Sequence, residues 1–163
     1  DILPASFYFR NFDLMLDNMT KSTTRLKKLL KNLEDEYDLI ILDCPPSINL
    51  LAENIFHAAD KILVPVIPTT LSERTLAQLV KFFNENDYKL KKLKPFFSMA
   101  QKGNKHHIAM IQQIEKKYPI FLKSLIGFSI AIEKMGIRRE PALSYADSRS
   151  LSQAYRHLFQ EVI

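Results

Sequence analysis

The chain has 163 residues, a length that suits one domain, and we predict a single domain over residues 1–163. With 47% hydrophobic and 25% charged residues it can bury a core, and its one cysteine, Cys44, excludes an internal disulfide or a metal site built from cysteines. The formal net charge of +5 favours binding to polyanions such as DNA. No apolar run approaches the roughly 20 residues that a membrane span needs. We expect a cytoplasmic protein.

Strand and helix patterns alternate along the chain. Apolar runs without alternation, such as 39–43 and 61–68, are typical of parallel strands covered on both faces, and leucines at helical spacing predict the helices between them. We therefore predict an α/β fold with three layers, in which helices cover both faces of a mostly parallel sheet. The predicted elements, in chain order, are a short strand within 1–6 that ends at Pro4, a helical turn or helix at 11–19, a helix at 21–37, a strand at 39–43, a helix at 48–60, a strand at 61–68, a helix at 71–86, a strand at 94–100, a helix at 104–119, a strand at 123–129, a short helix with a loop over 129–143, and a helix at 148–163.

Polar side chains just inside two of the predicted helices are candidates for N-caps. We expect Ser22 or Thr23 to cap the helix at 21–37, and Ser72 to cap the helix at 71–86. In each case the side-chain oxygen would accept a hydrogen bond from a free backbone N–H of the first turn.

The run 39–43 reads as a central strand that ends on a carboxylate, Asp43. Ligands of open parallel sheets bind beyond the carboxyl ends of the strands, and a carboxylate there can hold a divalent ion directly or through its waters. Pro45 and Pro46 stiffen the turn that follows, as suits a loop that responds to a ligand. The alternative is that Asp43 only caps this turn.

Residues 37–79 resemble the ParA/MinD family of deviant-Walker P-loop ATPases. In that family a strand ends in Asp-x-Pro-Pro, and a helix with an asparagine, an Ala-Ala-Asp segment and a strand with Val-Pro follow. The residues that match this pattern are Asp43, Pro45, Pro46, Asn54, Ala58, Ala59, Asp60 and Pro65. The segments 1–6 and 138–163 also resemble the corresponding parts of ParA proteins, so the resemblance covers essentially the whole chain.

The resemblance implies a P-loop NTPase-like fold and a ParA-type ATPase of chromosome or plasmid partitioning, located in the cytoplasm at the nucleoid or plasmid. Its cofactors would be ATP and magnesium, and its partners a second copy of the chain, DNA and a ParB-like activator. The MinD-like membrane branch and the iron–sulfur branch are disfavoured, because no amphipathic tail follows the last helix and only one cysteine is present.

The family's glycine-rich phosphate loop has no counterpart here, since no two glycines are adjacent. We therefore expect the chain to correspond to the C-terminal two-thirds of a ParA-like ATPase and to bind no nucleotide by itself. The alternative function is a nucleotide-free interaction or regulatory module that keeps the fold.

The resemblance also implies roles for single residues. Asp43 would be the catalytic residue that positions magnesium, through water, and the loop at Pro45 and Pro46 would report the nucleotide state. Phe128, Arg139 and Pro141 would border the base. Family members often carry Ile-Pro and a polar residue where Gly127 and Phe128 stand here. The alternative for Phe128 is a core phenylalanine, and the alternative for Arg139 and Pro141 is a solvated basic loop.

Lysines cluster in two segments that could contact DNA phosphates, although such runs are usually only solvated turns. The candidate DNA-binding residues are Lys89, Lys91, Lys92, Lys94, Lys102 and Lys105. The adjacent His106 and His107 have no third ligand in view, so we expect no metal site there. Cys44 has no histidine partner nearby in the sequence, and we expect it to serve packing.

Overall fold

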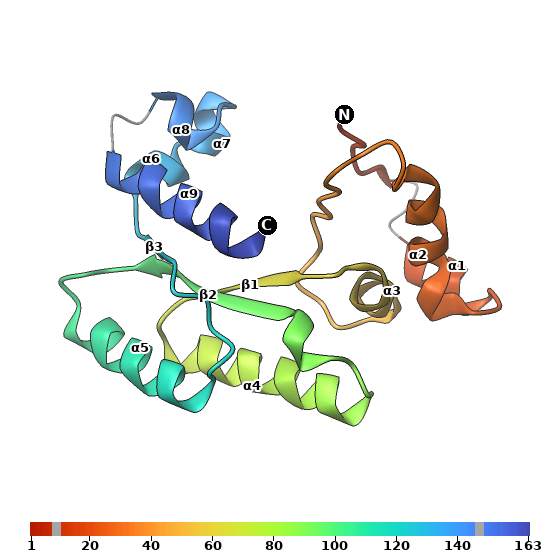
Figure 1. The fold of residues 1–163 in the computed structure, drawn as a ribbon, viewed down its shortest axis with the longest axis horizontal. Coiled ribbons are helices and arrows are strands. Elements are labelled where there is room, and N and C mark those ends of the chain that lie inside the picture. Colours follow the sequence, from red (N-terminus) through yellow and green to blue (C-terminus); the bar gives the residue numbers. More distant parts are fainter. Residues whose placement is uncertain (8–10, 146–148) are drawn as a thin grey trace. The chain divides into compact units, whose positions relative to one another are not determined.

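The computed structural model describes residues 1–7, 11–145 and 149–163, and the chain divides into two compact units, Asp1–Asp60 and Lys61–Ile163. In the described residues the first unit is built from helices and coil, and the second from a sheet and helices (Figure 1). The single domain that the sequence predicts over residues 1–163 remains a prediction.

The first unit holds short helices in place of the longer ones predicted. Its elements are α1 (Phe12–Asp17), the 3₁₀ turn η2 (Ser22–Thr24), α2 (Arg25–Leu30), the 3₁₀ turn η3 (Lys31–Leu33) and α3 (Leu50–Ala58). The predicted cap of the helix at 21–37 is wrong, because the chain enters α2 from η2, and Thr24 at the N-cap accepts no capping bond but donates its hydroxyl to the carbonyl of Lys21. The N–H of Thr24 is satisfied instead by the carbonyl of Lys21.

The strands predicted over 1–6 and 39–43 are wrong, since both segments are coil. Ile41, in the middle of the second run, is 80% exposed. An apolar run becomes a strand only where a neighbour supplies its backbone hydrogen bonds, and none of the strands in the described residues pairs with this one. Asp43 therefore follows an extended coil and not a central strand.

Helix α3 is the best anchored element of the first unit. Asn49 caps it, with its side-chain oxygen accepting a bond from the N–H of Ala52 over 3.0 Å. Asp13, from α1, accepts further bonds from the side chain of Asn49 and from the N–H of Leu51. Two polar residues that are distant in sequence thus satisfy the free donors at one helix start.

The second unit contains the sheet. Its elements are β1 (Ile62–Val66), α4 (Thr70–Glu85), the 3₁₀ turn η4 (Leu90–Lys92), β2 (Leu93–Ala100), α5 (Lys105–Lys117), β3 (Leu125–Gly127), α6 (Ile130–Glu133), α7 (Met135–Arg138), α8 (Ala142–Tyr145) and α9 (Arg149–Val162). The three strands are parallel, in the order β1-β2-β3. The first residue of the helix predicted at 148–163 lies outside the described residues.

Neighbouring residues of β2 face opposite sides of the sheet, and helices cover both sides (Figure 1). Phe97 packs with Leu76 of α4 and Ile114 of α5. Phe96 packs with Leu158 of α9 on the other side. The α/β fold with helices on both faces is confirmed, and the burial of β2 on both sides is why its sequence shows no alternation. In β1 one side stays open, since Leu63 and Pro65 are exposed.

The N-cap predicted for the helix at 71–86, which corresponds to α4, is wrong. Its N-cap is Thr69, whose hydroxyl oxygen accepts a bond from the N–H of Ser72, and not Ser72 itself. Thr69 has an extended backbone and follows Pro68, so its side chain folds back over the first turn, whereas Ser72 already lies inside the helix.

Candidate functional site

The loop that carries Asp43 is exposed and tightly turned. The N–H of Ser47 donates to the carbonyl of Pro45 over 2.9 Å, which closes a turn just before the capped start of α3. Asp43, Pro45 and Pro46 are all exposed to solvent. An exposed carboxylate is a hard oxygen donor that fits a magnesium ion held through its waters, since magnesium usually keeps several of them.

Cys44 lies beside this carboxylate and is exposed, so the packing role predicted for it is wrong. Partial burial of the sulfur, together with repulsion from the Asp43 carboxylate, raises the pKa of the Cys44 thiol. Its S–H donates to the carbonyl of Leu42. The thiolate is the nucleophilic form of cysteine, so a raised pKa makes this thiol less reactive.

In the second unit, the carboxyl ends of the strands lie at one edge, which we call the carboxyl edge. The loop after β1 leads into α4, capped by Thr69, and the loop after β2 leads into α5, capped by Asn104. The side-chain oxygen of Asn104 accepts bonds from the N–H groups of His106 and His107. Two helix N-termini, with their partial positive charge, therefore open at the edge where parallel sheets bind ligands.

Phe128 follows β3 at this carboxyl edge. Its N–H donates to the carbonyl of Ala100 at the end of β2 over 2.9 Å, which holds the backbone against the sheet. Phe128 is 42% exposed and is therefore not a core residue. A contact with a base remains a prediction.

Arg139 and Pro141 lie farther along the same segment, and both are exposed. The neighbouring Arg138 is occupied, since its guanidinium lies 4.5 Å from the centre of the Tyr145 ring. The hydroxyl of Tyr145 in turn donates to the carbonyl of Ala131. These contacts brace the segment and leave the side chain of Arg139 on its surface, where its predicted role with Pro141 remains untested.

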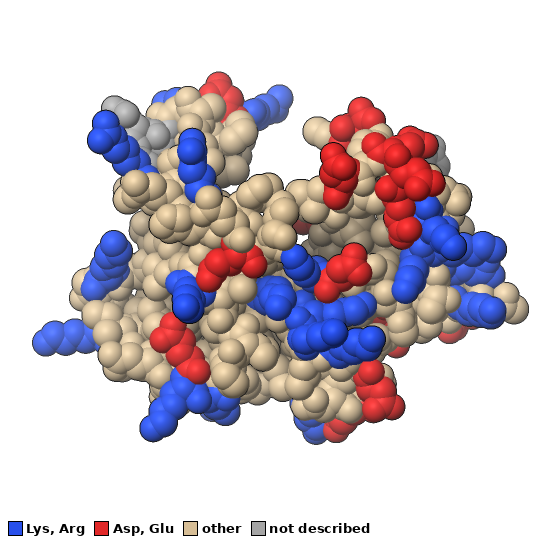
Figure 2. Space-filling model, in the orientation of Figure 1, with Lys and Arg blue, Asp and Glu red and all other residues tan. Residues whose placement is uncertain are grey.

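The structure separates the predicted DNA-binding lysines into two groups. Lys89 to Lys94 lie at η4 and the start of β2, whereas Lys102 and Lys105 lie beyond its end, on the carboxyl edge. The strand between them spans roughly 25 Å. Figure 2 shows basic side chains gathered over the part of the chain between α4 and β2. The two groups are thus not one patch, and DNA contact remains a prediction for both.

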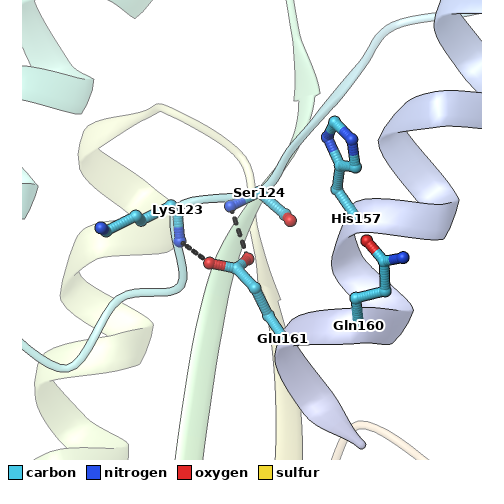
Figure 3. A pocket seen from close by; sticks show the side chains of 5 residues that line it. All are labelled: Lys123, Ser124, His157, Gln160 and Glu161. Atoms are coloured by element: carbon cyan, nitrogen blue, oxygen red, sulfur yellow. Dashed lines mark hydrogen bonds between the residues drawn. The ribbon is translucent and has the colours of Figure 1, made fainter.

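A surface pocket of about 310 Å³ lies where α9 meets the segment before β3 (Figure 3). Lys123, Ser124, His157, Gln160 and Glu161 line it. The Glu161 carboxylate accepts bonds from the N–H groups of Lys123 over 2.9 Å and Ser124 over 2.8 Å. Its oxygens therefore serve to attach α9 to the sheet.

This attachment makes a testable prediction about stability and pH. Burial raises the pKa of Glu161, but bonds from the Ser124 side chain and from the two N–H groups outweigh it, and the pKa falls below its ordinary value of 4.5. The stabilisation is therefore present above about pH 4.5 and is lost as pH falls through the lower folded-state pKa. Glu161→Gln should lower the free energy of unfolding by about 1 kcal/mol at neutral pH, a modest value because the side chain is largely exposed.

Urea unfolding followed by circular dichroism, from about pH 7 to about pH 3, measures this effect. The difference between the original chain and Glu161→Gln should shrink as the pH falls. A difference that is independent of pH would contradict the prediction. Glu115→Gln, at an exposed position on α5, is the control.

Asn54 is a structural residue whose partners the sequence did not reveal. It lies on α3, fully buried, and its amide donates to the carbonyl of Ser22 over 2.6 Å and accepts from the N–H of Leu26 over 3.1 Å. The one sequence signal for this structural role is an asparagine placed among the apolar residues of the predicted helix, within 50–58. The caps Asn49 and Asn104 could have been found, since each precedes an apolar-periodic segment.

Among the described residues there is no group of three or more His, Cys, Asp or Glu side chains arranged to hold a metal ion. None of the helices in these residues combines the length and the apolar character that crossing a bilayer requires.

The model of a family described as "AAA domain" matches residues 1–95. The chain is 29% identical over 168 residues to a ParA family protein of Chlamydia muridarum. The aligned region covers 100% of this chain and 66% of that protein. It is also 34% identical over 80 residues to the sporulation initiation inhibitor protein Soj of Bacillus subtilis. That aligned region covers 49% of this chain and 32% of Soj.

Among solved structures, the chain is similar to cobyrinic acid a,c-diamide synthase from Mycobacterium smegmatis, crystallised with ADP and magnesium. The TM-score is 0.68 at 21% identity, and the match covers 85% of this chain and 63% of that one. At this identity the likeness concerns the fold, and it places the chain among α/β proteins of P-loop NTPase type.

The class is therefore that of P-loop ATPases. Within it, the chain belongs to the ParA/MinD-type family that the AAA-domain model and the ParA and Soj relatives define. The chain spans about two-thirds of the length of the first of these relatives, 66%.

Proposed function

We propose that this chain is part of a ParA-type ATPase that acts in chromosome or plasmid partitioning. The observation that carries the proposal is the loop Asp43-Cys44-Pro45-Pro46, exposed and followed directly by the capped helix α3, within the segment that matches the family. Dimerisation with ATP, DNA binding, a ParB-like activator and a location at the nucleoid or plasmid belong to the same proposal.

In this function Asp43 holds the waters of a magnesium ion, and its exposure leaves the carboxylate free for that task. Magnesium bound with ATP would offset the charge on the phosphate oxygens. Pro45 and Pro46 fix the loop, so that a change at Asp43 is passed to the start of α3 and is not absorbed by a flexible turn. Phe128, Arg139 and Pro141 border the base.

The phosphates themselves need a cradle of backbone N–H groups, which the 163 residues do not contain as a glycine-rich loop. Phosphoryl transfer depends almost wholly on positioning and electrostatic stabilisation, so we expect this chain alone to hydrolyse ATP no faster than a control protein. The informative protein is this chain extended at its N-terminus by a strand and the family's Lys-Gly-Gly-x-Gly-Lys-Thr loop.

Isothermal titration calorimetry of the extended protein with ATP, in magnesium and in EDTA, tests the role of Asp43. We expect magnesium to strengthen ATP binding, and Asp43→Asn to reduce that gain by roughly 10- to 100-fold, as is typical for groups that hold a metal through its outer shell. Binding in EDTA should be unchanged, because the substitution removes a metal contact and no phosphate contact.

Asp35→Asn provides a matched control, since Asp35 is an exposed aspartate on the same unit. Equal losses for the two variants would contradict a specific role of Asp43. Failure of the extended protein to bind ATP at all would favour the alternative, a nucleotide-free interaction or regulatory module.

A further inference from the structure

The loop that joins β2 to α5, residues 101–104, forms a closed turn at the carboxyl edge (Figure 1). The N–H of Asn104 donates to the carbonyl of Gln101 over 3.1 Å. The N–H of Gln101 in turn donates to Nδ1 of His107 over 3.2 Å. Both backbone groups of Gln101 are therefore held, one by the turn itself and one by a side chain of α5. We call residues 101–107 the β2–α5 corner.

The acceptor that closes this corner is a titratable group. Nδ1 of His107 can accept the N–H of Gln101 only while the imidazole is neutral and carries its proton on Nε2. A protonated ring has an N–H at both nitrogens, so two donors would then face each other. Histidine is the side chain whose charge ordinarily changes between pH 5 and 8. The closing bond therefore depends on pH in a range where the rest of the fold keeps its charges.

The backbone just before the corner is strained. Met99 has a φ of 53°, in the left-handed region that residues other than glycine seldom adopt, and the pairing of β2 with β3 shifts register at this point. Such a conformation persists only where surrounding contacts hold it. The contacts here are the bond from the N–H of Phe128 to the carbonyl of Ala100 and the two bonds at Gln101. The bond to His107 thus helps to hold a conformation that would otherwise relax.

The surroundings of His107 offer no compensation for a positive charge. The charged and titratable groups beside it come from its own segment and are Lys102, Lys105 and His106. The loops that follow β1 and β3, residues 67–72 and 127–129, carry no charged side chain. On α4, Glu73 pairs with Lys117 at the far end of α5, whereas α6 and α9 pack on the opposite face of the sheet.

Among the residues that the structure describes, no carboxylate pairs with His107. A charged imidazole would also lie in the first turn of α5, where the free N–H groups already carry partial positive charge. Protonation would therefore break the bond to Gln101 without creating a new partner for the ring.

We propose that His107 is a pH-sensitive latch of the β2–α5 corner. The neutral ring keeps the corner closed, and protonation releases Gln101 and lets the backbone at Met99 relax. Because the corner carries Lys102 and the start of α5, its release shifts a cation and a helix N-terminus at the edge where parallel sheets bind ligands. The inference goes beyond the proposed function, since it concerns the loop itself and holds for any ligand of this edge.

Nuclear magnetic resonance on the chain as it is, without nucleotide, tests the latch between about pH 8 and about pH 5. The amide proton of Gln101 should move upfield with the same midpoint as the ring protons of His107, because it loses its acceptor. Its exchange with water, corrected for the intrinsic effect of pH, should become roughly 3- to 10-fold faster, as the loss of one exposed hydrogen bond allows.

Three variants separate the latch from other effects of pH. His107→Gln keeps an acceptor oxygen that does not titrate, so Gln101 should remain protected at both ends of the range. His107→Phe has no acceptor, so Gln101 should exchange fast at both ends. His106→Gln is the matched control, since this exposed neighbour contacts Asn104 only through its backbone N–H, and the pH response should persist.

An amide of Gln101 that does not respond to pH in the original chain would overturn the proposal. A response that persists in His107→Gln, or one that disappears in His106→Gln, would also overturn it, since another group would then be the switch. Circular dichroism of each variant checks its fold, and these surface changes should leave the spectrum intact. Because no nucleotide is present, failure of the ATPase proposal leaves this result unaffected, and failure here leaves the role of Asp43 standing.

Discussion

Replacing Phe97 with alanine should lower the free energy of unfolding by about 3–5 kcal/mol, the range for aromatic truncation in a packed core. Phe97 is 1% exposed at the centre of the sheet, where it packs between α4 and α5. Its ring also stacks on Phe121, with 4.5 Å between the ring centres. The substitution therefore removes an aromatic contact, and it leaves a cavity that the covered strand cannot collapse to fill.

Urea unfolding followed by far-ultraviolet circular dichroism measures this loss for the second unit. Phe159→Ala is the matched control, since this phenylalanine lies on α9 with its ring 58% exposed, and its loss should cost no more than about 0.5 kcal/mol. Phe97→Leu should fall between the two. Similar losses at positions 97 and 159 would show that β2 is not the centre of the core.

Replacing Asn54 with leucine should destabilise the first unit by about 2–4 kcal/mol. Leucine has nearly the same shape, so packing changes little, but the carbonyl of Ser22 and the N–H of Leu26 both lose their partner. An unsatisfied buried polar group costs about 1–3 kcal/mol. The substitution should release η2 and α2 from α3, because Asn54 is the polar residue that joins them.

Amide hydrogen exchange reports this release at the level of single segments. Protection at Leu26 and over residues 50–58 should fall in Asn54→Leu, while the strands of the second unit keep theirs. Asn32→Leu, at an exposed position of η3, serves as the control and should leave exchange unchanged. If protection at Leu26 survives in Asn54→Leu, then Asn54 does not hold the two helical segments together.

Much of the second unit could be read from the sequence, because its signals are local. The apolar runs at 62–66 and 93–100 and the helical periodicity of α4, α5 and α9 each lie within one segment. Pro95 could have argued against a central strand. It is tolerated because β3 pairs with β2 only from Phe97 onward, so its missing N–H costs no bond on that side.

The first unit was harder to predict, and the reason is physical. Residues 39–43 have the composition of a buried strand, but strand formation depends on a partner, which composition does not encode. The N-cap of α4 was predicted at Ser72, three residues after the actual cap, Thr69. A hydroxyl just before a helix and one inside its first turn look alike in sequence.

For the candidate site, the sequence by itself determined the family, because the Asp-x-Pro-Pro pattern with its downstream spacing lies within one continuous segment. Only the tertiary structure decided that Asn54 ties helical segments together and that the lysines divide between two edges of the sheet. Register and strand direction set which side chains become neighbours, and both arise from hydrogen bonds between segments that are distant along the chain.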